Sequence, residues 1–162
     1  MKLKVDCREK KLIKLLEAYK SHLKFENIDI EVERLDLGDI IIYDDEENEK
    51  LIVERKSLND LASSIKDGRY NEQSFRLSQF PLNNHFIYYV IEGNFGDFIA
   101  KNNEQTRKMV YSAMFSLSYT KGFSLLHGNG WLDTVEYLIR FMDRWGKGVP
   151  ALTNPDRSEE HT

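Results

Sequence analysis

The hydrophobic positions of this chain follow two periods along its length. Residues 10–21 carry apolar side chains at three- and four-residue spacing, which predicts an amphipathic helix. Residues 86–91 form an unbroken apolar run, which is typical of a central strand covered on both faces. Over the whole chain, the pattern predicts strands at residues 3–5, 28–34, 39–43, 51–55, 86–91 and 123–126, and helices at residues 10–21, 58–65, 70–80, 104–119 and 132–145.

This order of elements predicts an α/β fold in which helices flank a mixed central β-sheet. Residues 39–43 and 51–55 can pair as a hairpin, because the acidic segment 44–50 between them is typical of a solvated loop. The apolar pattern stops after Gly146, and residues 148–162 hold two of the three prolines. We therefore expect one domain over residues 1–147, followed by a flexible tail or a truncated linker at residues 148–162.

Composition and charge narrow the class of protein. The 162 residues include 41% hydrophobic and 31% charged positions, so the chain can bury a core, and its one cysteine excludes a disulfide within the chain. No apolar stretch reaches membrane-spanning length and the amino terminus lacks a signal-peptide pattern, so we expect a nuclear or cytoplasmic protein without membrane contact. The formal net charge of −4 argues against a generic nucleic-acid binder, although it does not exclude a nuclease with an acidic active site.

Two acids and a lysine give the chain its candidate chemistry. If residues 51–56 form a strand, Glu54 and Lys56 point to the same side, and the hairpin can bring Asp39 to the same patch. Carboxylates hold hard divalent cations, which activate water and neutralise the charge that builds up on a phosphodiester during hydrolysis. A nearby ammonium can orient the attacking water or stabilise the phosphate. The pattern therefore indicates a metal-dependent phosphodiesterase.

A longer motif makes this indication specific. The run of residues 53–61, continued by residues 64–70 and Gln73, resembles the ERKxxxD nuclease domain of the XPF/Hef structure-specific endonucleases, which belong to the PD-(D/E)xK superfamily. Upstream, residues 6–9 read Asp-Cys-Arg-Glu and resemble the D-x-R-E element of that family, and Gly38-Asp39 resembles its G-D element. The resemblance covers roughly residues 1–95 and implies a restriction-endonuclease-like fold.

The resemblance also implies roles for the residues of the motif. Asp39 and Glu54 would bind Mg²⁺ or Mn²⁺, and Lys56 would position water or stabilise charge. Arg55 and Asp60 would support them as further catalytic residues. Arg55 shares a strand face with apolar residues, and a buried guanidinium is costly unless it is paired, so we expect it to pair with a carboxylate such as Asp60 or to face phosphate. Asp60 could equally be an acid in the first turn of a helix.

Further polar residues flank this motif. Arg69, Gln73 and Arg76 fall at spacings of four and three, so one helix face could present them to DNA phosphates together with Arg8, or could simply be solvated. The resemblance implies that Asp6, Arg8 and Glu9 border the active site. Asp36 lies three residues before Asp39 and could be a further acid that supports the site. Capping of a helix by Asp6, ordinary solvation of Arg8 and Glu9, and a turn at Asp36 are the simpler alternatives.

Taken together, these features predict a metal-dependent endonuclease acting on branched DNA such as flaps, forks or junctions. A non-catalytic DNA-binding partner subunit is the main alternative, although such members typically lose the acid or the lysine of the motif, and a phosphodiesterase for RNA or a small nucleotide is a third reading. The helix at residues 132–145 has a wide apolar arc, which packs on the sheet or forms part of a dimer face. The resemblance implies a homodimer, or a heterodimer with a related subunit, through carboxy-terminal helices.

Overall fold

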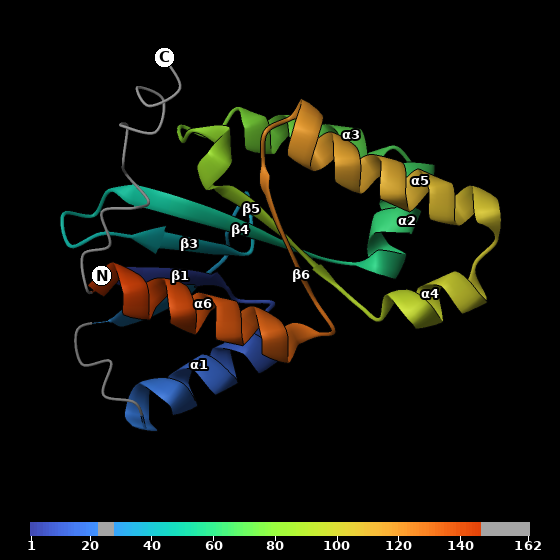
Figure 1. Cartoon of the computed structure of the whole chain (residues 1–162). Helices are drawn as coiled ribbons and strands as arrows, with labels where there is room; N and C mark the ends of the chain where they lie inside the picture. The colour runs from blue at the N-terminus through green and yellow to red at the C-terminus, as the bar shows by residue number, and fades with distance from the viewer. Residues whose placement is uncertain (23–27, 147–162) are drawn as a thin grey trace, which may run out of the picture.

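The structure, a computed structural model, describes residues 1–22 and 28–146. Its centre is a six-stranded sheet with the order β2-β1-β3-β4-β5-β6 (Figure 1). The strands of this described part are β1 (Lys2–Asp6), β2 (Asp29–Glu33), β3 (Ile40–Tyr43), β4 (Glu49–Ser57), β5 (Ile87–Glu92) and β6 (Ser124–Gly128). The sheet is mixed, because β3 runs antiparallel to both β1 and β4 while the other neighbouring strands pair in parallel.

Helices cover both faces of the sheet. They are α1 (Lys10–His22), α2 (Leu58–Lys66), α3 (Arg69–Ser78), α4 (Phe95–Lys101), α5 (Glu104–Phe115) and α6 (Trp131–Gly146), with a 3-10 turn η1 (Asn84–Phe86) and a π-helical turn η2 (Ser116–Thr120). Helices α1 and α6 lie side by side on one face, and α2, α3 and α5 lie on the other (Figure 1). None of the helices in residues 1–22 and 28–146 has both the length and the apolar character to cross a membrane.

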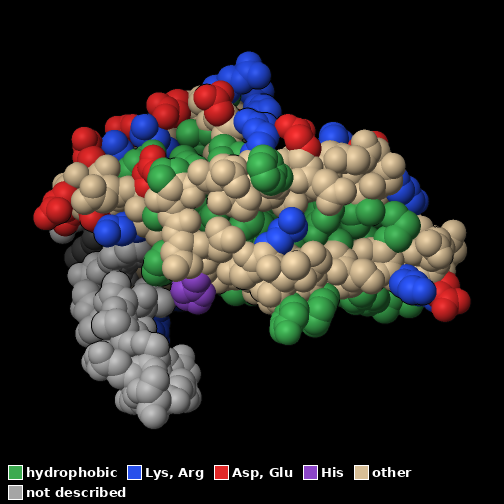
Figure 2. Space-filling view, turned by 90° about the horizontal axis from the view of Figure 1, so that it is seen from above, with side chains coloured by type: hydrophobic (Ala, Val, Ile, Leu, Met, Phe, Trp, Pro, Cys, Tyr) green, Lys and Arg blue, Asp and Glu red, His purple; other side chains and the backbone are tan. Residues whose placement is uncertain are grey.

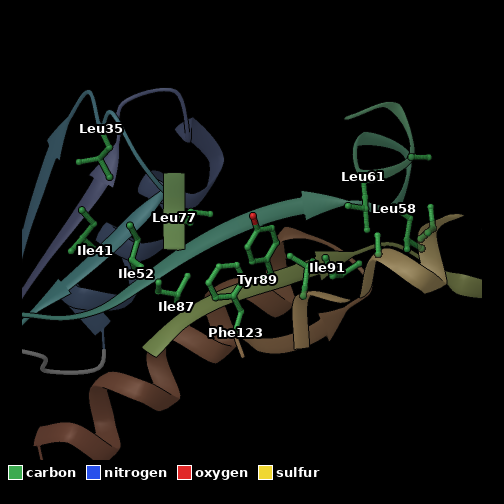
Figure 3. Close-up of a cluster of buried hydrophobic side chains, with 14 of the residues drawn as sticks. Leu35, Ile41, Ile52, Leu58, Leu61, Leu77, Ile87, Tyr89, Ile91 and Phe123 are labelled. Carbon is green, nitrogen blue, oxygen red and sulfur yellow. The ribbon is translucent and has the colours of Figure 1, made fainter. Parts of the chain in front are cut away.

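The sheet separates two hydrophobic cores. Along β4, Ile52 faces the core beneath α2, α3 and α5, whereas Leu51 and Val53 face the core beneath α1 and α6. Figure 3 shows the first of these cores, in which Tyr89 of β5 and Phe123 stack with 5.6 Å between their ring centroids. Because side chains alternate across a strand, the residues that follow Val53 in β4 continue to divide between the two faces.

The predicted mixed sheet flanked by helices is confirmed. Each predicted strand and helix overlaps an observed element, and the predicted hairpin is the antiparallel pair β3 and β4. The strand β4 begins at Glu49, so the loop is shorter than the expected segment 44–50. The helix expected at residues 104–119 is α-helical only to Phe115 and then continues as η2. The expected tail at residues 148–162 lies outside the described residues, and the extent of the domain stays a prediction.

The sequence pattern does not predict helix α4. Its seven residues are too few to show a helical period in their hydrophobic positions. Asn94 provides the local signal, since its side chain accepts a hydrogen bond of 3.0 Å from the backbone amide of Asp97 and so caps the first turn. The helix packs Phe98 into the core beneath α2.

Candidate active site

The candidate residues meet at one edge of the sheet. Asp39 directly precedes β3, its backbone amide donates to the carbonyl oxygen of Val53 at 2.8 Å, and its own carbonyl accepts from the amide of Asp6 at 2.9 Å. Since β3 is antiparallel to both neighbours, its start lies beside the ends of β1 and β4. The topology thus brings residues from three distant parts of the chain, around positions 6, 39 and 54, to the same edge.

A glycine directs the chain into this edge. Gly38 has a φ of +75°, which L-residues with a side chain rarely adopt. A Cβ atom at this position would lie 2.6 Å from Cγ1 of Ile52, which is fully buried. The glycine therefore lets the backbone pass against β4 and sets the position of Asp39.

Asp39 and Glu54 form a pair of carboxylates in an open cavity of about 420 Å³. Burial raises the pKa of Asp39 to about 6, opposed by a hydrogen bond of 2.7 Å that Oδ2 accepts from the backbone amide of Arg55. Burial, together with the nearby charge of Asp39, raises the pKa of Glu54 to about 8. The protein therefore holds two carboxylates where their charges repel each other, and a bound cation would relieve that repulsion.

Lys56 lies on the same side of β4 as Glu54, as strand parity predicts. Its Nζ donates a hydrogen bond of 2.8 Å to Oε1 of Gln73 on α3. Gln73 itself lines the cavity, so its amide fixes the ammonium of Lys56 beside the carboxylate pair. The charge of Lys56 lowers the pKa of Glu54, which burial and Asp39 raise.

Arg55 lies on the other face of β4, beneath α1 and α6. Its Nε and Nη2 each donate to a different carboxylate oxygen of Glu92 at 2.8 Å, and its Nη1 donates to Glu9. The expected carboxylate pairing is confirmed, but the partner expected from the sequence, Asp60, is wrong. Asp60 lies exposed in the first turn of α2, where its backbone amide donates to the side chain of Ser57. The simpler interpretation of Asp60, an acid at a helix start, describes the contacts observed there.

Asp6 fixes the two loops that carry Glu9 and Asp39. Its buried carboxylate accepts hydrogen bonds from the backbone amide and the guanidinium of Arg8 and from the backbone amide of Leu35, at 2.8 to 3.0 Å. The hydrogen bonds from the Arg8 side chain hold the pKa of Asp6 well below its usual range. Asp6 therefore joins two loops behind the cavity and does not cap α1, which was the simpler alternative.

Comparisons with known proteins place this geometry in a family. Residues 5–141 match the model of the ERCC4 domain. The chain belongs to this family. The ERCC4 domain is also the part that aligns with a probable crossover junction endonuclease mus81 of Dictyostelium discoideum, at 39% identity over 119 residues, which are 70% of this chain and 13% of that protein. A 3′-flap repair endonuclease Xpf of Saccharolobus solfataricus is 30% identical over 129 residues, covering 78% of this chain and 50% of that protein.

A solved structure supports the same assignment. The ERCC4 domain superposes on the XPF protein of Aeropyrum pernix in complex with DNA with a TM-score of 0.62 and 25% sequence identity, over 90% of this chain and 64% of that one. The resemblance to the XPF-type nuclease fold seen in the sequence is thereby confirmed. The chain spans 13% to 50% of the length of the two curated relatives named above.

Of the three residues on α3 that were expected to contact DNA phosphates, two line the cavity of the ERCC4 domain and one does not. Gln73 and Arg76 line the cavity, together with Arg8, Glu9 and Asp36. Arg76 donates from Nη2 to the backbone carbonyl of Asp36 at 3.1 Å, so it ties α3 to the loop before Asp39. Arg69 instead forms an exposed ion pair with Asp67 at 2.8 Å and is not among the residues that line the cavity.

Sequence reasoning missed Glu92, the last residue of β5. It is buried, binds Arg55 through both carboxylate oxygens, and accepts a hydrogen bond from the hydroxyl of Thr134 on α6. A signal was present, because Glu92 is an acid that directly follows the apolar run of residues 86–91. In the part of the ERCC4 domain that the structure describes, no three His, Cys, Asp or Glu side chains form a metal-binding cluster, so Asp39 and Glu54 stand as a pair.

Proposed function

We propose that this chain is the nuclease domain of a metal-dependent, structure-specific DNA endonuclease, which hydrolyses phosphodiester bonds in branched DNA such as flaps, forks or junctions. The observation that carries the proposal is the carboxylate pair of Asp39 and Glu54, held in an open cavity beside Lys56. Membership of the ERCC4 family supports it. So do the names of the relatives, which are crossover junction and 3′-flap repair endonucleases.

The residues fit a Mg²⁺ or Mn²⁺ ion. Both are hard cations that prefer carboxylate oxygens, and Mg²⁺ is commonly held by one or two carboxylates, with water and substrate phosphate completing its coordination. Asp39 and Glu54 would hold the ion, which would supply an activated water and neutralise charge on the phosphodiester. The raised pKa of both groups supports this assignment, because it reflects buried negative charge that the chain itself leaves partly uncompensated.

The basic residues in and beside the cavity would bind and orient the scissile phosphodiester. Lys56, fixed by Gln73, is placed to stabilise the extra negative charge of the phosphate as its bond to the leaving oxygen breaks. Arg8 and Arg76 line the cavity and supply positive charge that favours a phosphate over a neutral ligand. Catalysis then depends on the cavity holding these groups in a fixed arrangement.

A dimer belongs to this proposal, as a pair of identical or related subunits. On α6, most of the wide apolar arc is buried against the sheet, so that helix offers less free surface than the sequence suggests. Exposed aromatic side chains lie instead where α5 continues into η2: Phe115 and Tyr119 are 64% and 79% exposed and stack on each other. Figure 2 shows hydrophobic side chains among charged ones on this side of the molecule. A DNA substrate would place the protein in the nucleus or cytoplasm.

Cleavage of labelled DNA tests the proposal. The substrates are a 3′ flap, a fork, a four-way junction, a linear duplex and a single strand, each incubated with Mg²⁺, Mn²⁺ or EDTA. Glu54→Gln and Lys56→Ala are compared with the wild type. Matched controls lie at the other end of β4: Glu49→Gln removes an acid and Lys50→Ala removes a lysine, both away from the cavity.

We expect metal-dependent cutting of the branched substrates, which Glu54→Gln and Lys56→Ala abolish and the two control variants retain. Binding of branched DNA without cutting in either metal would overturn the proposal in favour of a non-catalytic subunit. A branched RNA of the same design is cut in parallel, and equal cutting of RNA and DNA would overturn the assignment of DNA as the substrate.

A further inference from the structure

The side chain of Arg55, near the end of β4, is held by three hydrogen bonds to carboxylates. It is 18% exposed, and each of its three nitrogens donates to a carboxylate, with Glu92 taking Nε and Nη2 and Glu9 taking Nη1. Glu92 in turn accepts a hydrogen bond from the hydroxyl of the fully buried Thr134. A connected set of contacts therefore runs from α6 through β5 to the end of β4.

This set of contacts ends at the carboxylate pair. Arg55 stands between Glu54 and Lys56 in the chain, and its backbone amide donates to Oδ2 of Asp39 at 2.7 Å. Fixing the side chain of Arg55 thus fixes the amide that holds Asp39 and the backbone on which Glu54 is carried. A displacement of about 1 Å at such a site is enough to lower the rate of a reaction strongly.

Glu92 also limits the number of hydrogen bonds that Glu9 accepts from Arg55. Glu9 lines the cavity that contains Asp39 and Glu54, whereas Glu92 does not. Because Glu92 accepts from two of the three donor nitrogens, Arg55 donates only one hydrogen bond to Glu9. Without Glu92, Nε and Nη2 of Arg55 would lose the carboxylate that holds them, and Glu9 would be left as the acceptor of the single hydrogen bond from Nη1.

A purely stabilising role explains these contacts poorly. Buried ion pairs recover little or none of their desolvation cost, and apolar residues in the same place are often as stable. Partners that hold the groups around a metal, by contrast, typically change metal affinity or activity by about 10- to 100-fold when they are removed.

We propose that Glu92, held by Thr134, is a positioning residue of this site: it fixes Arg55 so that Asp39 and Glu54 keep the arrangement in which a divalent cation binds. This inference rests on the proposed function, since it concerns the same carboxylate pair. It adds a residue of β5 and a residue of α6, neither of which belongs to the sequence motif, to the site.

The test measures Mn²⁺ affinity by calorimetry on the 162-residue chain, besides the kcat and KM for cleavage of a branched DNA. Glu92→Gln removes the charge and one of the two acceptors at nearly constant shape. Thr134→Val removes only the hydroxyl, and Thr134→Ser restores it. Glu136→Gln is the matched control, because Glu136 lies on the exposed side of α6 and pairs with Arg140 at 3.6 Å.

We expect Glu92→Gln to weaken Mn²⁺ binding and to lower kcat by about 10- to 100-fold. KM for DNA should change less than about twofold, because the residues proposed to bind phosphate, Arg8, Lys56 and Arg76, are unchanged. Thr134→Val should change both quantities in the same direction by a smaller factor, and Thr134→Ser and Glu136→Gln should match the wild type. A role in stability alone would lower the melting temperature and leave Mn²⁺ affinity and kcat of the folded protein as they are.

Native Mn²⁺ affinity and kcat in a folded Glu92→Gln variant would overturn the inference. If that variant does not fold, Thr134→Val decides, and wild-type Mn²⁺ affinity in it would overturn the inference equally. The proposed function can fail separately: a wild-type chain that binds Mn²⁺ but cuts no DNA would refute the nuclease, while the comparison of Mn²⁺ affinities would still decide the role of Glu92.

Discussion

Gly38 is a position where one added methyl group should be costly for two separate reasons. The residue has a φ of +75°, and a Cβ atom there would lie 2.6 and 2.7 Å from Cγ1 and Cδ1 of Ile52. Ile52 is fully buried in the core between the sheet and α2, so its side chain has little room to move aside. Gly38→Ala therefore combines an unfavourable backbone conformation with overpacking of the core.

The two costs can be estimated separately. A non-glycine residue in the left-handed region costs about 1–2 kcal/mol. Forcing extra volume into a packed core costs typically about 1–3 kcal/mol more. We therefore expect Gly38→Ala to lower the free energy of unfolding by about 2–5 kcal/mol, which is a large part of the 5–15 kcal/mol or so that stabilises a typical domain.

Two other glycines supply matched controls. Gly68 has a φ of +85° with no atom within 4 Å of an added Cβ, so Gly68→Ala should carry the backbone cost alone, about 1–2 kcal/mol. Gly130 has open space around an added Cβ and no positive φ, so Gly130→Ala should change stability by less than about 0.5 kcal/mol. Urea unfolding followed by circular dichroism measures all three variants against the wild type.

The difference between Gly38→Ala and Gly68→Ala isolates the contact with Ile52. If the two variants lose the same free energy of unfolding, the close approach of Gly38 to β4 does not constrain the chain, and the reasoning fails. The double variant Gly38→Ala with Ile52→Val should recover part of the loss, because it removes the Cδ1 atom that the added methyl group meets.

Three further outcomes follow from the charges of the site. Without metal, the free energy of unfolding should fall as pH rises from about 4.5 to about 8. The reason is that the raised pKa values of Asp39 and Glu54 let the folded state bind more protons in this range than the unfolded state does. A melting temperature that does not change with pH in EDTA would contradict this expectation. Saturating Mn²⁺ should raise the melting temperature of the wild type, by mass action on the folded state, but not that of Glu54→Gln. Asp6→Asn should destabilise the chain by about 1–3 kcal/mol in urea unfolding, since a buried acceptor of arginine and amide hydrogens is lost, whereas the exposed Asp67→Asn should stay within about 0.5 kcal/mol.

The features of this site that the sequence predicts correctly involve residues that are close together in the sequence. Strand parity places Glu54 and Lys56 on one side of β4, and a hairpin brings the start of β3 beside the end of β4. Both features follow from a few consecutive residues and one short loop. The fold class follows from the same kind of evidence, because each long element has its own hydrophobic period. Short α4 falls below that limit and depends on a cap instead.

The partners of Arg55 could not be predicted in this way, and the reason is topological. The buried guanidinium correctly predicts a carboxylate, and Asp60 is the nearest acid that follows it in sequence. But the chain turns into α2 at Leu58 on the opposite face of the sheet, which carries Asp60 away from Arg55. The acid that reaches Arg55 ends β5, a strand that lies beside β4 only because the chain crosses over through α2 and α3 and returns in parallel register.

The parallel register of β4 and β5 determines which acid can reach a buried arginine at the end of β4. In the pair of β4 and β5, Ser57 lies opposite Glu92 and Arg55 lies opposite Val90, so Glu92 is two residues beyond the partner of Arg55 and on the same face. Parallel strands end at the same edge of a sheet, so an acid that closes an apolar run is in reach of a base that closes the neighbouring strand. For a buried arginine at the end of a parallel strand, the candidate partner is therefore the acid that ends the next buried strand, ahead of the acid nearest in sequence.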